Sequence, residues 1–248
     1  MAKTFGWASG AVVAAMMCGT AVAQEKSAFS DAQRREMQGL IRAYLLENPE
    51  IINEMVDILQ EKQRTERDEQ QKATIAKHRD EIFDPPEATV IGNVKGDVTV
   101  VEFFDYNCGY CKQMFPAVME TLADDGKIRL VLKELPILGP PSEFAAKAAL
   151  ASRKQGKYSE FHQALLKSKG GLSEALIMTI AKDVGLDPEQ LRTDMQDKSI
   201  RDIIERNRDL ARDLQINGTP AVFVGENFYP GALSKENLLV AIDEARNR

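Results

Sequence analysis

The feature that most constrains this chain is a Cys-Gly-Tyr-Cys motif at residues 108–111, shortly after an apolar run. Residues 98–104 are rich in β-branched and aromatic side chains, which is typical of a buried strand, and residues 112–115 continue as a helix. Cys108 is therefore expected where a strand leads into a helix N-terminus. There the unpaired backbone N–H groups and the helix dipole favour a thiolate. They lower the pKa of such a cysteine from about 8.5 to roughly 3.5–7.5.

A CxxC motif is either a redox dithiol or half of a zinc site, and the remaining ligands decide between them. A structural zinc site needs four ligands. The chain has one further cysteine, Cys18, and two isolated histidines, His78 and His162. This favours the redox interpretation and no metal site. A purely structural disulfide between Cys108 and Cys111 would close a very small loop and constrain the unfolded chain little.

The first 23 residues have the pattern of a secretory signal peptide. Lys3 precedes an uncharged apolar stretch, and the segment ends in Ala-Val-Ala, a small-x-small cleavage pattern. Cleavage after Ala23 would remove Cys18 and leave the CxxC pair as the only cysteines. Export would place the protein in a compartment that permits disulfides. The net charge of −6 does not suggest a nucleic-acid partner.

Two amphipathic helices are predicted next. Ser30 and Gln33 are spaced as a capping box, and Asn48-Pro49 ends the first helix and begins the second. Each helix carries one apolar stripe. The first stripe is Met37, Leu40, Ile41, Tyr44 and Leu45, and the second is Ile51, Ile52, Met55, Ile58 and Leu59.

The segment 60–78 that follows is highly charged and has no predicted core face. As a helix it would span roughly 28 Å at about 1.5 Å per residue. We therefore expect the two stripes to pack against other copies of the chain, as an oligomerisation stalk. The alternative is that the helical hairpin folds back onto its own domain.

The remaining elements follow the order β-β-α-β, a helical insert, then β-β-α. Asp84-Pro85-Pro86 breaks the preceding helix and marks a boundary. The chain thus divides into a signal peptide at 1–23, an N-terminal helical oligomerisation region and linker at 24–84, and a domain at 85–248 whose insert covers about 138–214. The predicted strands are 89–93, 98–104, 128–133, 221–224 and 228–229, and the insert helices are 143–155, 157–168, 174–184, 188–196 and 199–214. His162 lies in this insert, and we interpret it as a packing or surface residue.

Disulfide exchange needs an attacking thiolate, a second thiol and an extended surface for the substrate backbone. Cys108, Cys111 and the Thr219-Pro220 loop could supply these in turn. Pro220 precedes a strand, where it cannot donate a ladder hydrogen bond, and an X-Pro bond can be cis. Glu102 lies in the apolar strand, where a carboxylate is protonated more easily than in water, and it could relay the proton of Cys111. The alternative is that Glu102 points to solvent by strand alternation.

The segments EFFDYNCGYC and NGTPAVFVG, together with the helical insert, resemble the DsbA-like branch of the thioredoxin superfamily over about residues 85–248. The resemblance implies an α/β thioredoxin fold with an inserted α-helical domain. It also implies that Cys108 is the nucleophile, that Cys111 resolves the mixed disulfide, that Pro220 is cis and that Glu102 is buried.

The active-site loop differs from that of the strongly oxidising family members. Gly109-Tyr110 stands in place of Pro-His, and Thr219 precedes the proline. Both choices resemble the dimeric isomerase DsbC. With the N-terminal helical extension, the chain is most similar to the trimeric suppressor-of-copper-sensitivity (ScsC) disulfide isomerases.

This resemblance implies a periplasmic disulfide isomerase or reductase that acts on misfolded or reduced exported proteins. It implies a homotrimer kept reduced by a DsbD-like or ScsB-like membrane reductase, with no cofactor beyond the redox-active disulfide Cys108–Cys111. Two alternatives remain. One is a dithiol oxidase recycled by a DsbB-like quinone reductase. The other is a copper-sequestering protein in which the two cysteines bind Cu(I) as soft ligands.

Overall fold

The structure is a computed structural model that describes residues 29–247. The expected signal peptide at 1–23, with Cys18, lies outside the described residues. The chain forms two compact units, of which the first ends at Lys62 and the second begins at Gln63. Among the described residues, no helix is long and apolar enough to cross a membrane.

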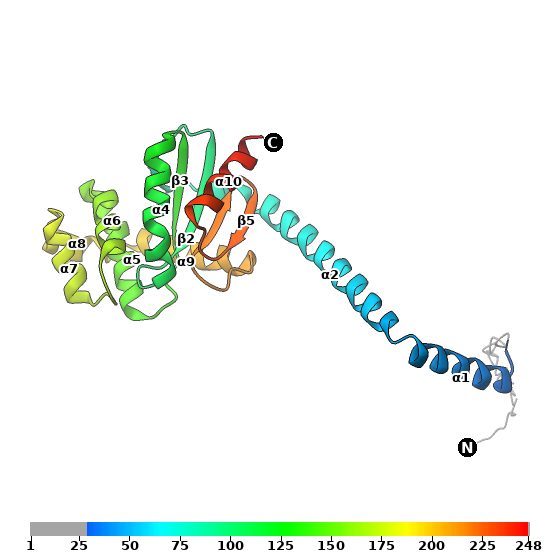
Figure 1. Cartoon of the computed structure of the whole chain (residues 1–248). Helices are drawn as coiled ribbons and strands as arrows, with labels where there is room; N and C mark the ends of the chain where they lie inside the picture. Colours follow the sequence, from blue (N-terminus) through cyan, green and yellow to red (C-terminus); the bar gives the residue numbers. More distant parts are fainter. Residues whose placement is uncertain (1–28, 248) are drawn as a thin grey trace, which may run out of the picture. The chain divides into compact units, whose positions relative to one another are not determined.

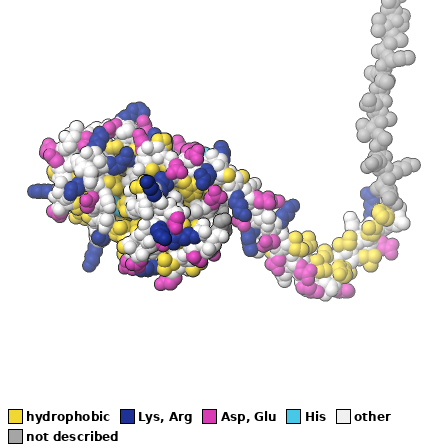
Figure 2. All heavy atoms as spheres, turned by 90° about the horizontal axis from the view of Figure 1, so that it is seen from above, with side chains coloured by type: hydrophobic (Ala, Val, Ile, Leu, Met, Phe, Trp, Pro, Cys, Tyr) yellow, Lys and Arg dark blue, Asp and Glu magenta, His cyan; other side chains and the backbone are white. Residues whose placement is uncertain are grey.

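The first unit contains helix α1 (Asp31–Glu47) and the beginning of helix α2 (Glu50–Lys77). The predicted capping box is present, since the Ser30 hydroxyl accepts from the Gln33 N–H and the Gln33 side chain accepts from the Ser30 N–H. No residue of 29–62 is buried. Figure 2 shows apolar side chains gathered along this segment. The exposed large apolar residues here include Met37, Leu40, Ile41, Tyr44, Ile52, Met55, Ile58 and Leu59.

The second unit begins earlier than the boundary expected after Asp84. Ile75 in the last turns of α2, and Ile82 in helix α3 (Arg79–Phe83), are buried in the core beneath the sheet. The segment 60–78 therefore has a core face at its C-terminal end, contrary to the expectation. A single buried isoleucine in a charged helix gives no periodic pattern that the sequence could reveal.

The sheet has five strands in the order β1-β3-β2-β4-β5, with β2 at its centre. Strands β2 and β3 are parallel, whereas the other neighbouring pairs are antiparallel. This is the predicted thioredoxin arrangement. The strands are β1 (Thr89–Gly92), β2 (Val98–Phe104), β3 (Ile128–Glu134), β4 (Ala221–Val224) and β5 (Asn227–Pro230).

Helices cover both faces of the sheet (Figure 1). Helix α4 (Gly109–Asp125) and helix α10 (Lys235–Arg246) pack on one face, where Val100 and Phe104 of β2 join the larger core cluster. On the other face, Val101 and Phe103 pack with α3 and with the end of helix α9 (Lys198–Asp213). The period of two along β2 thus sends alternate residues to opposite cores.

The helical insert between β3 and β4 is confirmed. Its helices agree with the predicted ranges to within about three residues, and a 3-10 turn (Arg153–Gln155) follows the first of them. They are α5 (Pro140–Ser152), α6 (Tyr158–Lys167), α7 (Glu174–Asp183), α8 (Pro188–Asp194) and α9 (Lys198–Asp213).

Candidate active site

Cys108 lies at the junction between the central strand and helix α4. It is the N-cap residue of α4, and its N–H donates to the Asp105 carbonyl at 3.0 Å. Cys111 lies in the first turn of the helix. The side chain of Cys108 is 6% exposed and that of Cys111 is fully buried at 0%, so the first sulfur is the more accessible one. Both cysteines are in the reduced form.

The two thiols have very different acidities. The pKa of Cys108 is lowered to about 5, first because the Cys111 thiol donates a hydrogen bond to its sulfur. The Thr219 side chain and the backbone N–H groups of Tyr110 and Cys111 also stabilise the thiolate, whereas burial opposes the shift. The bond that Cys111 gives to Cys108, its burial and the nearby Glu102 raise the pKa of Cys111 far above its ordinary value. At neutral pH Cys108 is thus a thiolate and Cys111 keeps its proton.

The Thr219–Pro220 peptide bond is cis, as expected. This loop lies against the first cysteine, since Cys108 Sγ is 3.1 Å from the Thr219 carbonyl oxygen. Thr219 is half-buried and Pro220 is buried at the start of β4. The structure therefore brings the two sequence-predicted segments together.

Glu102 is 5% exposed and lies on the α4 face of the sheet, between Val100 and Phe104 in the alternation of β2. The alternative in which it points to solvent is wrong, because β2 is buried on both faces. Burial raises the pKa of Glu102 to about 8, and the charge of Cys108 adds to this. The carboxyl is therefore largely protonated at neutral pH.

The central dipeptide of the motif lies at the surface. Gly109 begins α4 with open space where a Cβ would be, and the Tyr110 side chain is 67% exposed. Neither residue covers the Cys108 sulfur with a buried side chain. The exposed ring of Tyr110 can therefore contact a bound protein next to the Cys108 sulfur.

A buried polar cluster lies behind the motif and was not predicted. Tyr158 and Tyr106 donate to Glu134 Oε1 at 2.8 and 3.2 Å, and the Tyr106 hydroxyl lies 2.9 Å from His162 Nδ1. Burial raises the pKa of Glu134 to about 8 and lowers that of His162 to about 3. His162 is a buried packing residue, stacked on Tyr158. A glutamate ending an apolar strand was the sequence signal for this cluster.

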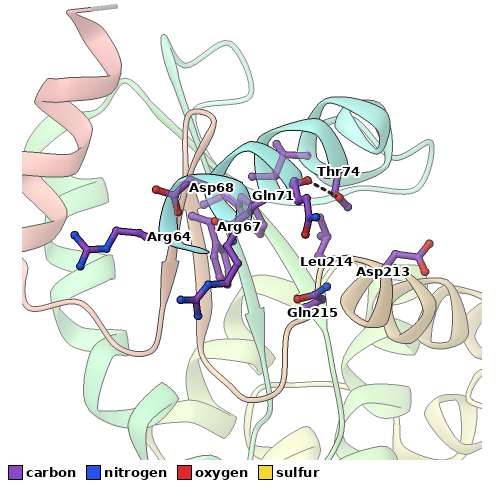
Figure 3. Close-up of a pocket in the computed structure, with 12 residues that line it drawn as sticks. Arg64, Arg67, Asp68, Gln71, Thr74, Asp213, Leu214 and Gln215 are labelled. Atoms are coloured by element: carbon purple, nitrogen blue, oxygen red, sulfur yellow. Dashed lines mark hydrogen bonds between the residues drawn. The ribbon is translucent and has the colours of Figure 1, made fainter. Parts of the chain in front are cut away.

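A cavity of about 470 Å³ lies on the face of the sheet opposite helix α4 (Figure 3). Its lining includes the apolar side chains of Phe223 and Phe228 and the charged side chains of Arg64, Arg67 and Asp213. It contains no residue of the CxxC motif or of the Thr219-Pro220 loop. Within residues 29–247, no group of three or more His, Cys, Asp or Glu side chains is arranged to hold a metal ion.

Two protein families match this sequence. Residues 99–243, more than half of the chain, match the DSBA-like thioredoxin domain. Residues 33–66 match the copper resistance protein ScsC N-terminal domain. The two matches fall on the two parts of the chain that the sequence analysis distinguished.

Solved structures and a curated relative extend these matches. A thioredoxin-like oxidoreductase from Silicibacter pomeroyi is 46% identical, with a TM-score of 0.67 over 68% of this chain and 98% of that one. Proteus mirabilis ScsC in a transitional conformation is 29% identical, with a TM-score of 0.65 over 89% of this chain and 98% of that one. The Na(+)/H(+) antiporter NhaA 3 of Salinispora tropica is 34% identical over 65% of this chain, which spans about a quarter, 25%, of that protein's length.

Proposed function

The chain belongs to the DSBA-like thioredoxin domain family of thiol-disulfide oxidoreductases, and on this premise we propose that it is a periplasmic disulfide isomerase or reductase for exported proteins. The observation that carries the proposal is the pairing of an ionised Cys108 with a protonated, buried Cys111. The signal pattern at residues 1–23 supports export. A similar protein from Salmonella enterica, 27% identical, is described as periplasmic.

The proposed reaction begins when the Cys108 thiolate attacks one sulfur of a client disulfide. A Cys108–client disulfide forms, and the other client sulfur leaves as a thiolate. In isomerisation that thiolate attacks another client disulfide, and a client thiolate finally displaces Cys108. In reduction Cys111 attacks the Cys108 sulfur, the client thiolate leaves, and the Cys108–Cys111 disulfide forms. Glu102 in its ionised form takes the proton of Cys111, which a pKa of about 8 permits near neutral pH.

The protein acts as a homotrimer in this proposal. The exposed stripes of α1 and the beginning of α2 need a partner surface, because exposed contiguous apolar patches mark interaction sites. The ScsC N-terminal domain match at 33–66 coincides with these stripes. A DsbD-like or ScsB-like membrane reductase would return Cys108 and Cys111 to the dithiol form after each reduction of a client.

Trapping of client proteins tests the proposal. Cys111→Ala should accumulate mixed disulfides with misfolded exported proteins that carry disulfides, whereas Cys108→Ala should accumulate none. Alkylation of the wild-type dithiol by iodoacetamide should be half-maximal near pH 5, the pKa of Cys108. If Cys111 is the sulfur alkylated at low pH, the roles are reversed and the proposal fails.

A second assay separates isomerase from oxidase activity. Scrambled ribonuclease recovers activity only if disulfides are reshuffled, and fully reduced ribonuclease recovers only if they are formed. We expect the reduced protein to reactivate the scrambled enzyme. Faster oxidation of reduced ribonuclease by the disulfide form, with no reshuffling, would favour the dithiol oxidase.

Copper sequestration is a second candidate, because part of the chain matches a domain family described as a copper resistance protein. Cys108 and Cys111 offer two soft thiol ligands in hydrogen-bond contact, and such ligands select Cu(I). Competition with a Cu(I) chelator should then show one ion per chain. Either Cys108→Ala or Cys111→Ala should abolish that binding, while retention in both variants would exclude this site.

A further inference from the structure

The residues on both sides of the CxxC motif are bonded to one loop of the helical insert, residues 168–172, between α6 and α7. Its sequence is Ser-Lys-Gly-Gly-Leu, and residues 169–171 are exposed. Two successive glycines have large backbone freedom. Such a loop keeps one position beside the site only if other groups hold it.

Lys112, in the first turn of α4, holds the first half of this loop. Its Nζ donates to the Ser168 carbonyl and to the Ser168 hydroxyl, both at 3.1 Å, and to the Gly170 carbonyl at 2.7 Å. All three acceptors belong to the loop. The lysine that directly follows Cys111 therefore fixes two positions of the loop at once.

Asn107, which directly precedes Cys108, holds the other end. Its Oδ1 accepts from the Leu172 N–H at 2.6 Å, and its Nδ2 donates to the Ser142 hydroxyl at the start of α5 at 3.1 Å. A Cβ added to Gly171 would lie 4.0 Å from Asn107 Oδ1, which places the glycine pair next to this side chain. Asn107 itself is oriented by its N–H, which donates to Asp105 Oδ1 at 2.7 Å.

The loop is thus tied at residues 168, 170 and 172 by the two side chains that flank the motif. Lys112 occupies the Gly170 carbonyl, but Gly170 and Gly171 are both exposed, and the peptide groups of Gly171 have no hydrogen-bond partner among the described residues. Exposed peptide groups can pair with an extended chain, as in recognition by strand addition. A small disulfide has no long backbone to pair in this way.

We propose that loop 168–172 forms one side of the surface that binds protein clients at the active site. Asn107 and Lys112 are the positioning residues that hold this loop, and they thereby favour extended protein clients over small disulfides. This inference rests on the proposed disulfide exchange. Asn107 and Lys112 would act through the loop, without touching the reacting sulfurs.

The test compares two substrates of the full chain, scrambled ribonuclease and glutathione disulfide. Lys112→Met and Asn107→Ala should raise the ratio of the ribonuclease KM to the glutathione disulfide KM by about three- to tenfold, because each lost hydrogen bond is worth roughly 0.5–1.5 kcal/mol. Lys112→Arg should recover part of the loss. Lys167→Met is the matched control, since it removes the same charge one residue before the loop and leaves the three Lys112 bonds in place. Its KM ratio should equal that of the wild type.

Two further measurements separate the effect of the loop from misfolding of the variants and from changes in the disulfide-exchange step itself. Gly171→Val covers the exposed peptide groups and should raise the same ratio. Apart from its chain neighbours, Asn107 Oδ1 at 4.0 Å is the only atom of the described residues within 4 Å of the added Cβ. Trypsin should cut after Lys169 faster in Asn107→Ala than in the wild type. An unchanged KM ratio in both Gly171→Val and Asn107→Ala would overturn this inference alone. Failure of the wild type to turn over either substrate would instead overturn the proposed function, and the inference with it.

Discussion

Cys108 Sγ lies 3.1 Å from the carbonyl oxygen of Thr219, a residue 111 positions later in the sequence. In the thiol form the sulfur donates its proton to this carbonyl. In the thiolate form that bond is lost, and the sulfur depends on donors from Cys111, the Thr219 side chain and the helix N-terminus. The same loop thus provides an acceptor for the thiol and a donor for the thiolate.

Replacing Thr219 by valine should separate these two contributions. Thr219→Val keeps the carbonyl and the side-chain shape but removes the hydroxyl, so the pKa of Cys108 should rise above about 5. Less thiolate stabilisation means a less stable reduced form and a more negative reduction potential. A rise of one unit in this pKa destabilises the thiolate by about 1.4 kcal/mol, which lowers the reduction potential of the two-electron couple by roughly 30 mV.

Equilibration with glutathione measures this potential, and iodoacetamide titration measures the pKa. Thr219→Ser keeps the hydroxyl and is the control, for which we expect values close to those of the wild type. Equal potentials for the valine and serine variants would show that the hydroxyl does not stabilise the thiolate.

Glu102→Gln should stabilise the fold at neutral pH and slow the resolving step. The folded pKa of Glu102 is about 8, above the unfolded value of about 4.3. Its contribution to stability is therefore fully present below about pH 4.3 and is lost as the pH rises through 8. The glutamine variant has no such loss. Its free energy of unfolding should therefore exceed that of the wild type by an amount that grows over this pH range, to the order of 3 kcal/mol near pH 7.

Urea unfolding of the reduced protein at pH 4, 6 and 8 measures this advantage. Single-turnover release of a client from Cys108 should be slower in the variant, because the glutamine cannot take up the proton of Cys111. A variant whose stability advantage is the same at all three pH values would contradict the assigned burial of the carboxyl.

The sequence predicted elements whose signals are local. The apolar run of β2, the N-cap position of Cys108 and the Ser30–Gln33 capping box of α1 all appear where expected, because a strand or a helix end is set by neighbouring residues. The position of Glu102 was left open. Only the two cores packed on opposite sides of the sheet show that both faces of β2 are buried.

Contacts between distant positions could not be predicted in the same way. The bonds of Tyr106 join it to Glu134, 28 positions away, and to His162, 56 positions away. Lys112 reaches Ser168, also 56 positions away. No periodic pattern encodes such pairs, because each depends on how the insert packs on the sheet. The start of the second unit was missed for the same reason.

Tyr158→Phe should destabilise the protein without changing the acidity of Cys108. The variant removes the shorter of the two tyrosine bonds to the buried Glu134 carboxyl, at 2.8 Å. Tyr106 still donates to the same oxygen, so the variant loses one hydrogen bond, roughly 0.5–1.5 kcal/mol of unfolding free energy. Tyr110→Phe removes a hydroxyl from an exposed ring and should leave stability unchanged. A shift of the Cys108 alkylation midpoint in Tyr158→Phe would show instead that the cluster acts on the nucleophile.

The most informative truncation begins at Gln63. A chain that started at Pro85 would lose Ile82, which is fully buried, together with Ile75, and the resulting hole in the core would obscure any effect of assembly. Starting at Gln63 removes the exposed stripes of α1 and the beginning of α2 and keeps the whole second unit. We expect this chain to be a monomer by light scattering, with the unfolding midpoint and the Cys108 alkylation midpoint of the full chain.

The truncated chain should still reduce disulfides but should lose most of its ability to reactivate scrambled ribonuclease. In an assembly, several CxxC sites face one bound client, and the second encounter between a client disulfide and a thiolate takes place at a raised effective concentration. Reduction needs only one encounter and is insensitive to this gain, whereas reshuffling needs several before the client is released. Within the full chain, replacing Leu40 and Ile58, which are exposed on the two stripes, by glutamate should produce the same monomer and the same selective loss. A monomeric full chain, or a truncated chain that reshuffles as well as the full one, would show that the N-terminal helices have a different role.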